Sequence, residues 1–557
     1  MKKIKFDPSG ICLSADDNDS IFEAVLKNGF VMRGECGGKG TCGKCRCLAN
    51  GREELACRHI PAHDSIISAD IFLHGESLSL CHRKLDYAVS PFIHTESFSI
   101  EIGEFRDYMS SFKAFFPDSS EPDLEFLRQL SLLTGRTGSV SVLFAGKRPI
   151  SVCPDGGRIS VGIVDIGTTA VKCLLADLNE GTVKAEASAL NAQRRYGTDL
   201  ISRIIASKDN LEDMSACIWN SVKSLFLKMA SESGLPFPSI LLIAGNTVMS
   251  SLFCGISPDS IRRIPGGPVS ASFPFIRKEH VACCLVPAAS GFVGGDVVSG
   301  CVNVGLCREQ EPSMLIDLGT NGEIALGCSD WIGVCSASAG PAFEGGGIKC
   351  GMIALDGAVF HASVSADGVD LSVIGGEKPL GLCSSGVISL IAGLFRNGMI
   401  DRSGRFTERS SAVNGRLFLA EGKNGDIFID EDDIANLLRA KAAIFAGAES
   451  LLASFGMSFS DLKNVYIAGS VSEHCMIDDC FEIGLFPPVC RDKIVIVGNS
   501  SLAGCLDILL DSERWIESEK ISENALFVDL ASEASFMDRW GAALFIPHTD
   551  DIYGELI

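Results

Sequence analysis

The sequence predicts a multidomain α/β protein with a small α+β domain at the N-terminus, a small α+β middle domain and a large duplicated α/β domain. Three observations support this prediction. A glycine-rich loop with closely spaced cysteines lies near the N-terminus, a phenylalanine-rich stretch with a turn-rich break follows it, and an apolar strand followed by Asp-x-Gly-Thr occurs twice after residue 158. The expected boundaries are 1–85 for the first domain, 86–117 for a linker, 118–157 for the middle domain and 158–557 for the large domain.

The N-terminal loop has the composition of an iron-sulfur site. Four cysteines follow the pattern C-x5-C-x2-C-x11-C, and they are Cys36, Cys42, Cys45 and Cys57. A 2Fe-2S cluster needs four thiolates, and its loop must turn sharply enough to direct backbone N–H groups at the sulfides, which glycine permits. The spacing and the glycines therefore predict a 2Fe-2S cluster on these cysteines.

The fourth ligand has to return to the loop from outside it. Residues 46–49 are expected to form a short strand, Asn50-Gly51 is a strong hairpin signal, and residues 53–56 lead Cys57 back toward the loop. Cys81 is the alternative fourth ligand, and the hairpin favours Cys57. A zinc site is a weaker interpretation because zinc knuckles normally show two C-x2-C pairs, and structural disulfides are weaker still. The loop resembles plant-type ferredoxin domains, with a last interval similar to that of succinate dehydrogenase iron-sulfur subunits, which implies a β-grasp ferredoxin fold.

Composition limits the classes of protein and partner. The chain has 557 residues, 46 % hydrophobic and 21 % charged, enough for several packed domains. Its net charge of -22 argues against nucleic acid and anionic membranes as partners. Its 23 cysteines, an odd number scattered along the chain, indicate a reducing compartment and an anaerobic source. With no signal-like segment and no run of about 18 apolar residues, a cytoplasmic protein is expected.

Several secondary-structure elements are expected from local patterns. Residues 64–72 are expected to be the last strand of the first domain, whereas six phenylalanines in 86–117 show no clean period and indicate a linker. The middle domain should contain a helix at 124–133 and strands at 139–144 and 149–153. In the large domain, apolar stripes with helical spacing predict helices at 210–229 and 432–452.

The repeated motif predicts a nucleotide site. Residues 161–169 are echoed by residues 314–322, about 150 residues further along, and each copy is an apolar strand that ends in Asp-x-Gly-Thr. Glycine lets the backbone approach phosphate oxygens, threonine binds them, and an aspartate at the strand end can hold hydrated Mg²⁺. Asp165 and Asp317 are therefore the expected Mg²⁺ residues. The expected phosphate-binding residues are Gly167, Thr168, Thr169, Gly319, Thr320 and Asn321.

These motifs resemble the two phosphate motifs of the superfamily that contains acetate and sugar kinases, actin and the heat-shock ATPases. The resemblance implies an actin-like ATPase that binds ATP between two duplicated α/β domains. Residues 465–470 are similar to its adenosine motif, which implies that Gly469 and Ser470 lie near the nucleoside. Residues 291–296 and 498–504 are similar to its glycine-rich hinge segments. The chain departs from the usual adenosine motif by continuing as Val471-Ser472-Glu473-His474, which is bulkier and charged.

The whole chain resembles the reductive activators of corrinoid enzymes. The likeness rests on the ferredoxin-like loop together with residues 244–249, 286–296, 317–323 and 339–346. It implies a protein that uses ATP to return an inactive Co(II) corrinoid protein to Co(I). The implied partners are a low-potential electron donor and a corrinoid protein of a methyltransferase or demethylase system, and a homodimer is a further expectation.

Three residues have two interpretations each. Asp296 either orients the attacking water or caps a helix N-terminus. Ser336 and Ser338 lie in a loop of small residues, expected at 335–341, that suits the approach of a partner or of the corrinoid, with tight packing as the alternative. Two other functions stay open for the chain: a metabolite kinase with a redox-sensing ferredoxin domain, and a non-catalytic switch in which nucleotide and cluster state control docking.

Overall fold

A computed structural model describes most of the chain. The described residues are 2–7, 12–16, 19–27, 30–32, 46–49, 52–68, 71–73, 90–100, 108–133, 138–154, 157–197, 199–263, 275–352, 354, 357–365, 368–376, 378–423, 425–469 and 476–550. The chain forms two compact units, one from 1–78, 347–437 and 470–483 and the other from 79–346, 438–469 and 484–557. In the described residues, no helix is long and apolar enough to cross a membrane.

The N-terminal part of the first unit is a small α+β domain. Its main sheet has the strand order β2-β1-β6-β4-β5, made by β1 (Lys2–Asp7), β2 (Cys12–Ala15), β4 (Arg46–Ala49), β5 (Arg52–Leu55) and β6 (Ser65–Ser68). Helix α1 (Ile21–Lys27) supplies Ile21 to the core, beside Ile4 and Phe6. The β4–β5 pairing confirms the predicted hairpin.

One strand of this domain differs from its prediction. Residues 64–72 were expected to be one strand, but β6 pairs with β1 and β4, whereas β7 (Ile71–Leu73) pairs with β3 (Phe30–Met32) in a separate two-stranded sheet. The pairing partner changes between Ser68 and Ile71, so an alternating apolar pattern that runs through both strands does not reveal the break.

The rest of the first unit, where it is described, carries two small sheets and helices α8 (Ser384–Arg396) and α10 (Ile477–Glu482), with the start of α9 (Glu431–Ser454). Strands β20 (Ala358–Ser365), β21 (Gly368–Val373) and β22 (Gly381–Leu382) form one sheet, and β23 (Arg416–Glu421) pairs with β24 (Asp426–Asp430). Helix α8 packs on β20 and contacts α10.

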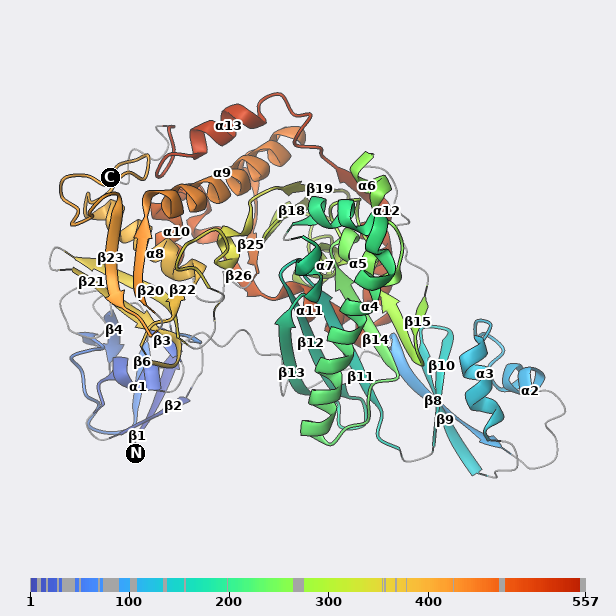
Figure 1. Ribbon diagram of the computed structural model, residues 1–557. Helices are drawn as coiled ribbons and strands as arrows, with labels where there is room; N and C mark the ends of the chain where they lie inside the picture. The colour runs from blue at the N-terminus through green and yellow to red at the C-terminus, as the bar shows by residue number, and fades with distance from the viewer. Residues whose placement is uncertain are drawn as a thin grey trace. The chain divides into compact units, whose positions relative to one another are not determined.

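A small middle domain begins the second unit. Strands β8 (Ile93–Ile100), β9 (Gly138–Ala145) and β10 (Arg148–Pro154) form an antiparallel sheet, accompanied by α2 (Tyr108–Phe115) and α3 (Leu124–Ser131), as Figure 1 shows. Strands β9 and β10 and helix α3 confirm the expected elements. The ring of Phe92 stacks on Trp515 with centroids 4.6 Å apart, which packs the start of β8 against the large domain.

The linker predicted at 86–117 needs correction. Residues 93–100 form strand β8, and residues 108–115 form α2, whose Phe112 is buried against Phe126 and Phe144. The described phenylalanines show no single period because they come from different elements and pack in different places, Phe92 against the large domain and Phe112 and Phe116 in the core of the middle domain. This part of the segment therefore belongs to the middle domain.

The large domain contains two six-stranded sheets that share a five-stranded core and differ in the position of the sixth strand. The first has the order β13-β12-β11-β14-β16-β15 and the second β26-β25-β17-β18-β19-β27. In each, a central strand pairs antiparallel with the next strand of the chain and parallel with a later one. The strands are β11 (Ser160–Ile166), β12 (Ala170–Asp177), β13 (Thr182–Leu190), β14 (Ile240–Gly245), β15 (Ile276–Lys278), β16 (Val281–Leu285), β17 (Ser313–Leu318), β18 (Gly322–Gly327), β19 (Ile332–Ala337), β25 (Val465–Ala468), β26 (Ile494–Gly498) and β27 (Ala525–Phe527).

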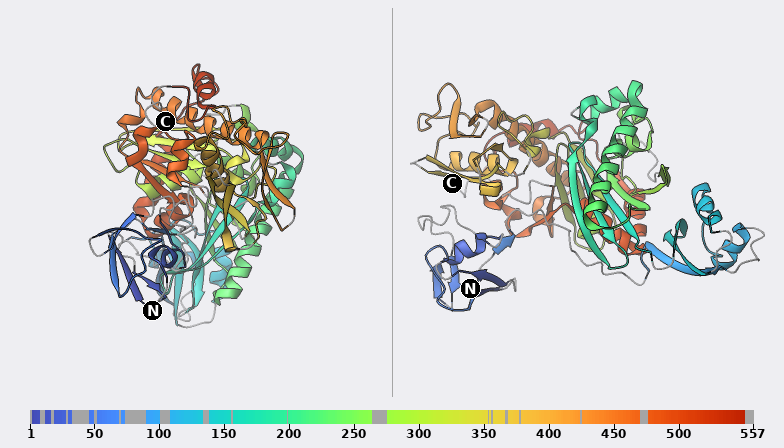
Figure 2. Two further views of the ribbon diagram at one scale, coloured as in Figure 1. Left: turned by 90° about the vertical axis from the view of Figure 1, so that its left-hand side faces the viewer. Right: turned by 60° about the horizontal axis from the view of Figure 1, so that its bottom comes forward.

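Helices cover these sheets and lie between them. Helix α4 (Leu200–Ser233) runs along the first sheet (Figures 1 and 2), and α7 (Gly295–Val304) crosses α11 (Ser500–Leu510). The crossing is tight, since a Cβ on Gly504 would lie 1.8 Å from the Ser299 carbonyl oxygen. The remaining helices of this unit are α5 (Thr247–Cys254), α6 (Asp259–Arg263), α9 (Glu431–Ser454, which continues from the first unit), α12 (Ser512–Asn524) and α13 (Phe536–Ala543).

The two predicted long helices are present, with one corrected start. Helix α9 confirms the prediction at 432–452, whereas α4 begins ten residues before Asn210. Asn210 has non-helical backbone angles (φ -130°) and marks a kink. The kink interrupts the helical periodicity, so the apolar stripe predicts only the part of the helix from Asn210 onward.

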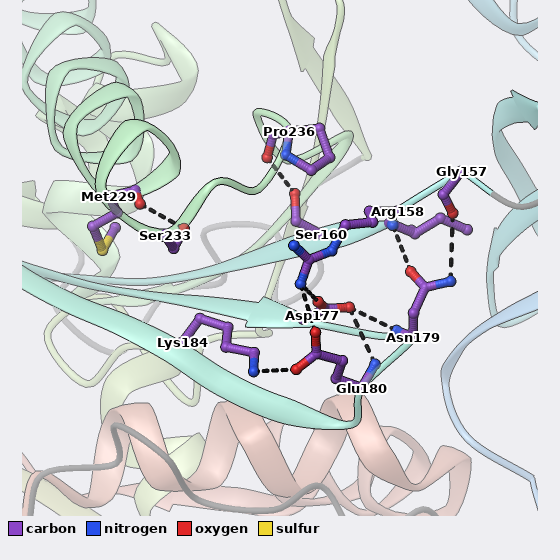
Figure 3. Close-up of polar contacts among 11 residues, drawn as sticks. Gly157, Arg158, Ser160, Asp177, Asn179, Glu180, Lys184, Met229, Ser233 and Pro236 are labelled. Carbon is purple, nitrogen blue, oxygen red and sulfur yellow. Dashed lines mark hydrogen bonds and ion pairs between the residues drawn. The ribbon is translucent and has the colours of Figure 1, made fainter.

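A polar network fastens the outer end of the first sheet (Figure 3). The Arg158 guanidinium donates to the fully buried Asp177 carboxylate at 2.6 Å and to Glu180 at 2.7 Å. Asp177 also accepts the backbone N–H of Asn179 at 2.8 Å in the turn between β12 and β13. These bonds hold the hairpin at the end of the sheet opposite the Asp-x-Gly-Thr turn.

Candidate functional site

The two Asp-x-Gly-Thr motifs form equivalent tight turns. Residues 167–169 join β11 to β12, and residues 319–321 join β17 to β18, each closing an antiparallel hairpin. A Cβ on Gly167 would lie 2.8 Å from the Ala170 carbonyl oxygen, so this turn needs glycine. Asn321 is half-buried at the second turn. The motif therefore has the predicted strand-turn-strand geometry in both copies.

The two turns meet in space. The Thr169 and Thr320 hydroxyl oxygens lie 3.2 Å apart although the residues are 151 positions apart in the chain. Both hydroxyls donate hydrogen bonds to one oxygen, Oε2 of Glu344. The duplication predicted that the motifs would face each other, whereas the glutamate between them was not predicted.

Glu344 is delivered by a rigid turn. It ends a short 3₁₀ helix, Pro341–Glu344, whose flanking Gly340 and Gly345 have positive φ (76° and 75°) that favours glycine. Phe343 is fully buried and anchors the turn in the core. The sequence contains Glu344 within the glycine-containing segment 339–346, but it does not indicate which residues the Glu344 carboxylate contacts.

Four carboxyl groups gather behind the threonines. Burial raises the pKa of Asp165, and burial together with the charge of Asp165 raises the pKa of Asp317 to about 7. Burial and the charges of Asp165 and Asp317 raise the pKa of Asp296 to about 8. Burial, then the charges of Asp296 and Asp317, raise the pKa of Glu323 well above its usual range. Each of these buried carboxyl groups therefore opposes the ionisation of its neighbours.

Two asparagines tie this acidic cluster across the duplicated halves. Asn246, at the N-terminus of α5 in the first half, donates to Glu323 Oε1 of the second half at 2.6 Å. Asn499, at the N-terminus of α11 in the second half, donates to Asp165 Oδ2 of the first half at 3.2 Å. Each amide therefore spans from one half to a carboxylate of the other. Glu323, Asn246 and Asn499 lay in segments noted for their resemblance, but only the fold brings them to one place.

Positive charge comes from two further residues that sequence reasoning missed. Lys172 lies opposite Asp165 on β12, and its charge lowers the pKa of both Asp165 and Asp317 against the raising effect of burial. Arg203 is fully buried in α4 and donates to the carbonyl oxygen of the buried Thr168 at 2.6 Å. Burial lowers the pKa of Arg203 to about 10. The buried Arg203 guanidinium thus stabilises the first turn through its hydrogen bond to Thr168.

The structure shows whether Asp296 caps the N-terminus of helix α7. The residue that caps α7 is Gly294, and Asp296 stands in the first turn, where its Oδ1 accepts the Val297 N–H at 2.9 Å. A Cβ on Gly294 would lie 2.3 Å from the Gly245 carbonyl oxygen, so the close approach of α7 to β14 requires glycine there. The N-cap interpretation is therefore wrong, and Asp296 lies with the acidic cluster.

Gly469 lies beside the second turn. It follows β25 with φ of +97°, and a Cβ there would lie 2.4 Å from the Leu318 carbonyl oxygen and 2.9 Å from Asp317 Oδ1. Glycine at the end of this strand is therefore needed for the second turn to keep its position. Ser470, the other expected nucleoside residue, lies outside the described residues.

Ser336 and Ser338 differ from the predicted loop. Ser336 belongs to strand β19 and pairs with Glu323 of β18, so the two residues share one face of the sheet. Ser338 follows the strand and is exposed. Of the loop expected at 335–341, residues 335–337 are the end of strand β19, residues 338–340 are irregular as expected, and residue 341 begins the 3₁₀ helix. Alternating small residues fit a buried strand as well as a loop.

The expected cluster ligands are only partly described. Cys36, Cys42, Cys45 and the alternative ligand Cys81 lie outside the described residues. Cys57 is described, half-buried, and packs at the edge of the core just after β5. In the described part of the chain, no group of three or more His, Cys, Asp or Glu side chains is placed to hold a metal ion directly.

Comparisons with known proteins agree along the length of the chain. Residues 161–309 match the family described as "RACo middle region", and residues 311–555 match "C-terminal domain of RACo the ASKHA domain". The corrinoid activation enzyme RamQ of Eubacterium limosum is 28% identical over 560 residues, covering 92% of this chain and 93% of RamQ. A Co(II) methylated amine-specific corrinoid protein reductase of Methanosarcina barkeri is 30% identical over 262 residues, covering 42% of this chain and 46% of the relative.

A solved structure gives the same result. The protein described as "Reductive activator for corrinoid,iron-sulfur protein" has a TM-score of 0.77 and 32% sequence identity, and the match covers 100% of each chain. The match to the ASKHA domain covers the second turn and the second sheet, and the match to the middle region covers the first turn and most of the first sheet. This chain therefore belongs to the family of reductive activators of corrinoid proteins.

Proposed function

We propose that the protein is an ATP-hydrolysing reductive activator that passes a low-potential electron from a 2Fe-2S cluster to an inactive Co(II) corrinoid protein and restores Co(I). The observation that carries the ATPase part is the meeting of the two Asp-x-Gly-Thr turns, Thr169 to Thr320, in front of four carboxyl groups. The relatives, an activation enzyme for corrinoid proteins and a reductase of a Co(II) corrinoid protein, support the reaction.

The nucleotide residues have distinct roles in this proposal. The Thr169 and Thr320 hydroxyls, with backbone N–H groups around Gly167 and Gly319, bind phosphate oxygens. Asp165 and Asp317 hold waters of a hydrated Mg²⁺, because side chains that cannot hold an ion directly can still reach it through its water shell. Asp296 accepts a hydrogen bond from the attacking water and orients it. When bound, Mg²⁺ supplies the positive charge that lets these carboxyl groups ionise together.

The cluster site fits its proposed group where the structure describes it. The β4–β5 hairpin returns the chain so that Cys57 follows directly after β5, as a fourth ligand for Cys36, Cys42 and Cys45 requires. When bound, the 2Fe-2S cluster supplies one-electron transfer.

Nucleotide binding has an energetic task in this reaction. A one-electron gap of some 250 mV between donor and cobalt corresponds to about 6 kcal/mol. We propose that docking on the corrinoid protein makes its cobalt easier to reduce and that ATP binding or hydrolysis then releases the partner. Moving such an equilibrium almost completely requires about 10⁴-fold discrimination between two states. The proposed partner-facing residues are Ser338, which is exposed, and Ser336, which pairs with Glu323 in the sheet.

One experiment separates this function from its alternatives. Mg²⁺-dependent ATP hydrolysis is measured with and without a Co(II) corrinoid protein, for the full chain and for Asp317→Ala. The proposal predicts hydrolysis that the corrinoid protein stimulates and that Asp317→Ala abolishes, while visible absorption of the cluster persists. Transfer of phosphate to a small acid or sugar would instead establish the metabolite kinase, and nucleotide binding without hydrolysis would establish the switch.

A further inference from the structure

The Glu344 carboxylate occupies the place where the proposed nucleotide site offers its hydroxyl donors. Its Oε2 accepts from both Thr169 and Thr320, one from each duplicated half. Its Oε1 also lies over Gly319, since a Cβ on Gly319 would be 3.6 Å from that oxygen. The carboxylate thus covers the second turn and bridges to the first.

Nothing in the described residues neutralises this carboxylate at close range. No Lys or Arg nitrogen there lies within 4.0 Å of it, and its short contacts are the two threonine hydroxyls. The nearest support is indirect, because Arg203, which holds the Thr168 carbonyl, feels the charge of Glu344 from a distance. The two hydroxyls are therefore the main polar partners of Glu344.

A threonine hydroxyl has only one O–H donor. While that hydrogen points to Glu344, the hydroxyl cannot donate to a phosphate oxygen. A phosphate that binds both turns must therefore take both donors from Glu344, and its negative charge also opposes a carboxylate at the same place. Glu344 and a bridging phosphate exclude each other on grounds of both donor number and charge.

We propose that Glu344 is a resident competitor of the nucleotide: it joins the two turns when no nucleotide is bound, and the terminal phosphate of a triphosphate displaces it. This inference rests on the proposed function and adds its regulation. The phosphate that spans the turns takes over the link between the two halves, whereas a diphosphate that reaches only one turn leaves Glu344 in place. Release requires only rotation about the side-chain bonds of Glu344, so the turn that carries it can stay in place.

The test compares nucleotide affinities of the full chain with Glu344→Gln. This substitution keeps the size of the side chain but removes the charge and the strong acceptor. Glu311→Gln is the control, since Glu311 is exposed and precedes β17, at the strand end opposite Asp317. Dissociation constants for a non-hydrolysable ATP analogue and for ADP, each with Mg²⁺, are measured by calorimetry. If Glu344→Gln is insoluble, Glu344→Asp replaces it, because the shorter carboxylate cannot bridge both hydroxyls.

Glu344→Gln is expected to raise the affinity for the ATP analogue at least about fivefold relative to ADP, because it removes the population in which the donors are occupied. Glu311→Gln is expected to leave this ratio within about twofold of the unmodified protein. An unchanged or lowered ratio in Glu344→Gln overturns the competitor role while the nucleotide site stands. Failure of the unmodified protein and all variants to bind either nucleotide overturns the proposed ATPase function together with this inference.

Discussion

At the scale of single residues, the site is defined by groups whose charges oppose one another. Asp165, Asp296, Asp317 and Glu323 share a small volume, and Lys172 offsets only part of their repulsion. The sequence predicted three of these acids from their places after apolar strands or glycines. The sequence did not predict the roles of Glu323, Glu344 and Arg203. Their hydrogen bonds join the two halves of the duplication or connect a distant helix to the first turn.

The raised pKa values predict that stability depends on pH. Asp296 and Asp317 keep their protons in the folded protein up to about pH 8 and 7, whereas the unfolded chain loses them near 3.8. The folded state then binds more protons, so without Mg²⁺ the free energy of unfolding falls as the pH rises from 3.8 through 7 and 8. Thermal unfolding at pH 6 and pH 8.5 should show a lower midpoint at pH 8.5, and Asp296→Asn should reduce the difference. An equal or higher midpoint at pH 8.5 would contradict the arrangement.

Cysteine substitutions test which residue is the fourth cluster ligand. If Cys57 ligates the cluster, Cys57→Ser should abolish or markedly shift the 2Fe-2S absorption and EPR signals, because a serine oxygen is a poor replacement for a thiolate. Cys81→Ser is the matched control and should leave both signals nearly intact. The reverse pattern would assign the ligand to Cys81.

At the scale of elements, the hairpins and long helices follow from local sequence, and their packing does not. The β4–β5 hairpin, strands β9 and β10 and helices α3 and α9 agree with turn signals and apolar spacing. Strand β8 and the start of α4 did not, since Ser and Thr mask the alternation of the strand and a kink at Asn210 interrupts the helical stripe. The crossing of α7 and α11 depends on glycines whose need is visible only when both helices are present.

This crossing gives a stability prediction with an internal control. Gly504→Ala places a Cβ 1.8 Å from the Ser299 carbonyl oxygen, so the helices must separate, and overpacking of this kind costs about 1–3 kcal/mol. Gly541→Ala is the control, because Gly541 lies in α13 with no atom within 4 Å of the new Cβ. In an open helical position alanine is favoured over glycine by about 1 kcal/mol. Urea unfolding should therefore show opposite signs for the two substitutions, and equal destabilisation would argue against the tight crossing.

At the scale of the whole molecule, a small N-terminal α+β domain, with its proposed cluster site, and a duplicated ASKHA domain share one chain. The sequence predicted the duplication because both copies keep Asp-x-Gly-Thr after a buried strand, and the two sheets repeat one five-stranded core. The sequence also predicted the family, because several glycine-rich segments together resemble its members. The sequence did not predict the hydrogen bonds of Asn246, Asn499 and Glu344, because these bonds join residues that are far apart in the chain.

The most direct measurement of the central claim is the appearance of Co(I) absorbance in a Co(II) corrinoid protein, followed anaerobically with ATP and a physiological electron donor. The intact chain should produce Co(I). A chain lacking residues 1–85 should hydrolyse ATP in response to the corrinoid protein but produce no Co(I), because the ATPase turns and the cluster cysteines belong to separate domains. Normal cobalt reduction by the truncated chain would contradict the proposed electron route, and an intact chain that neither binds nor reduces a corrinoid protein would contradict the proposed function itself.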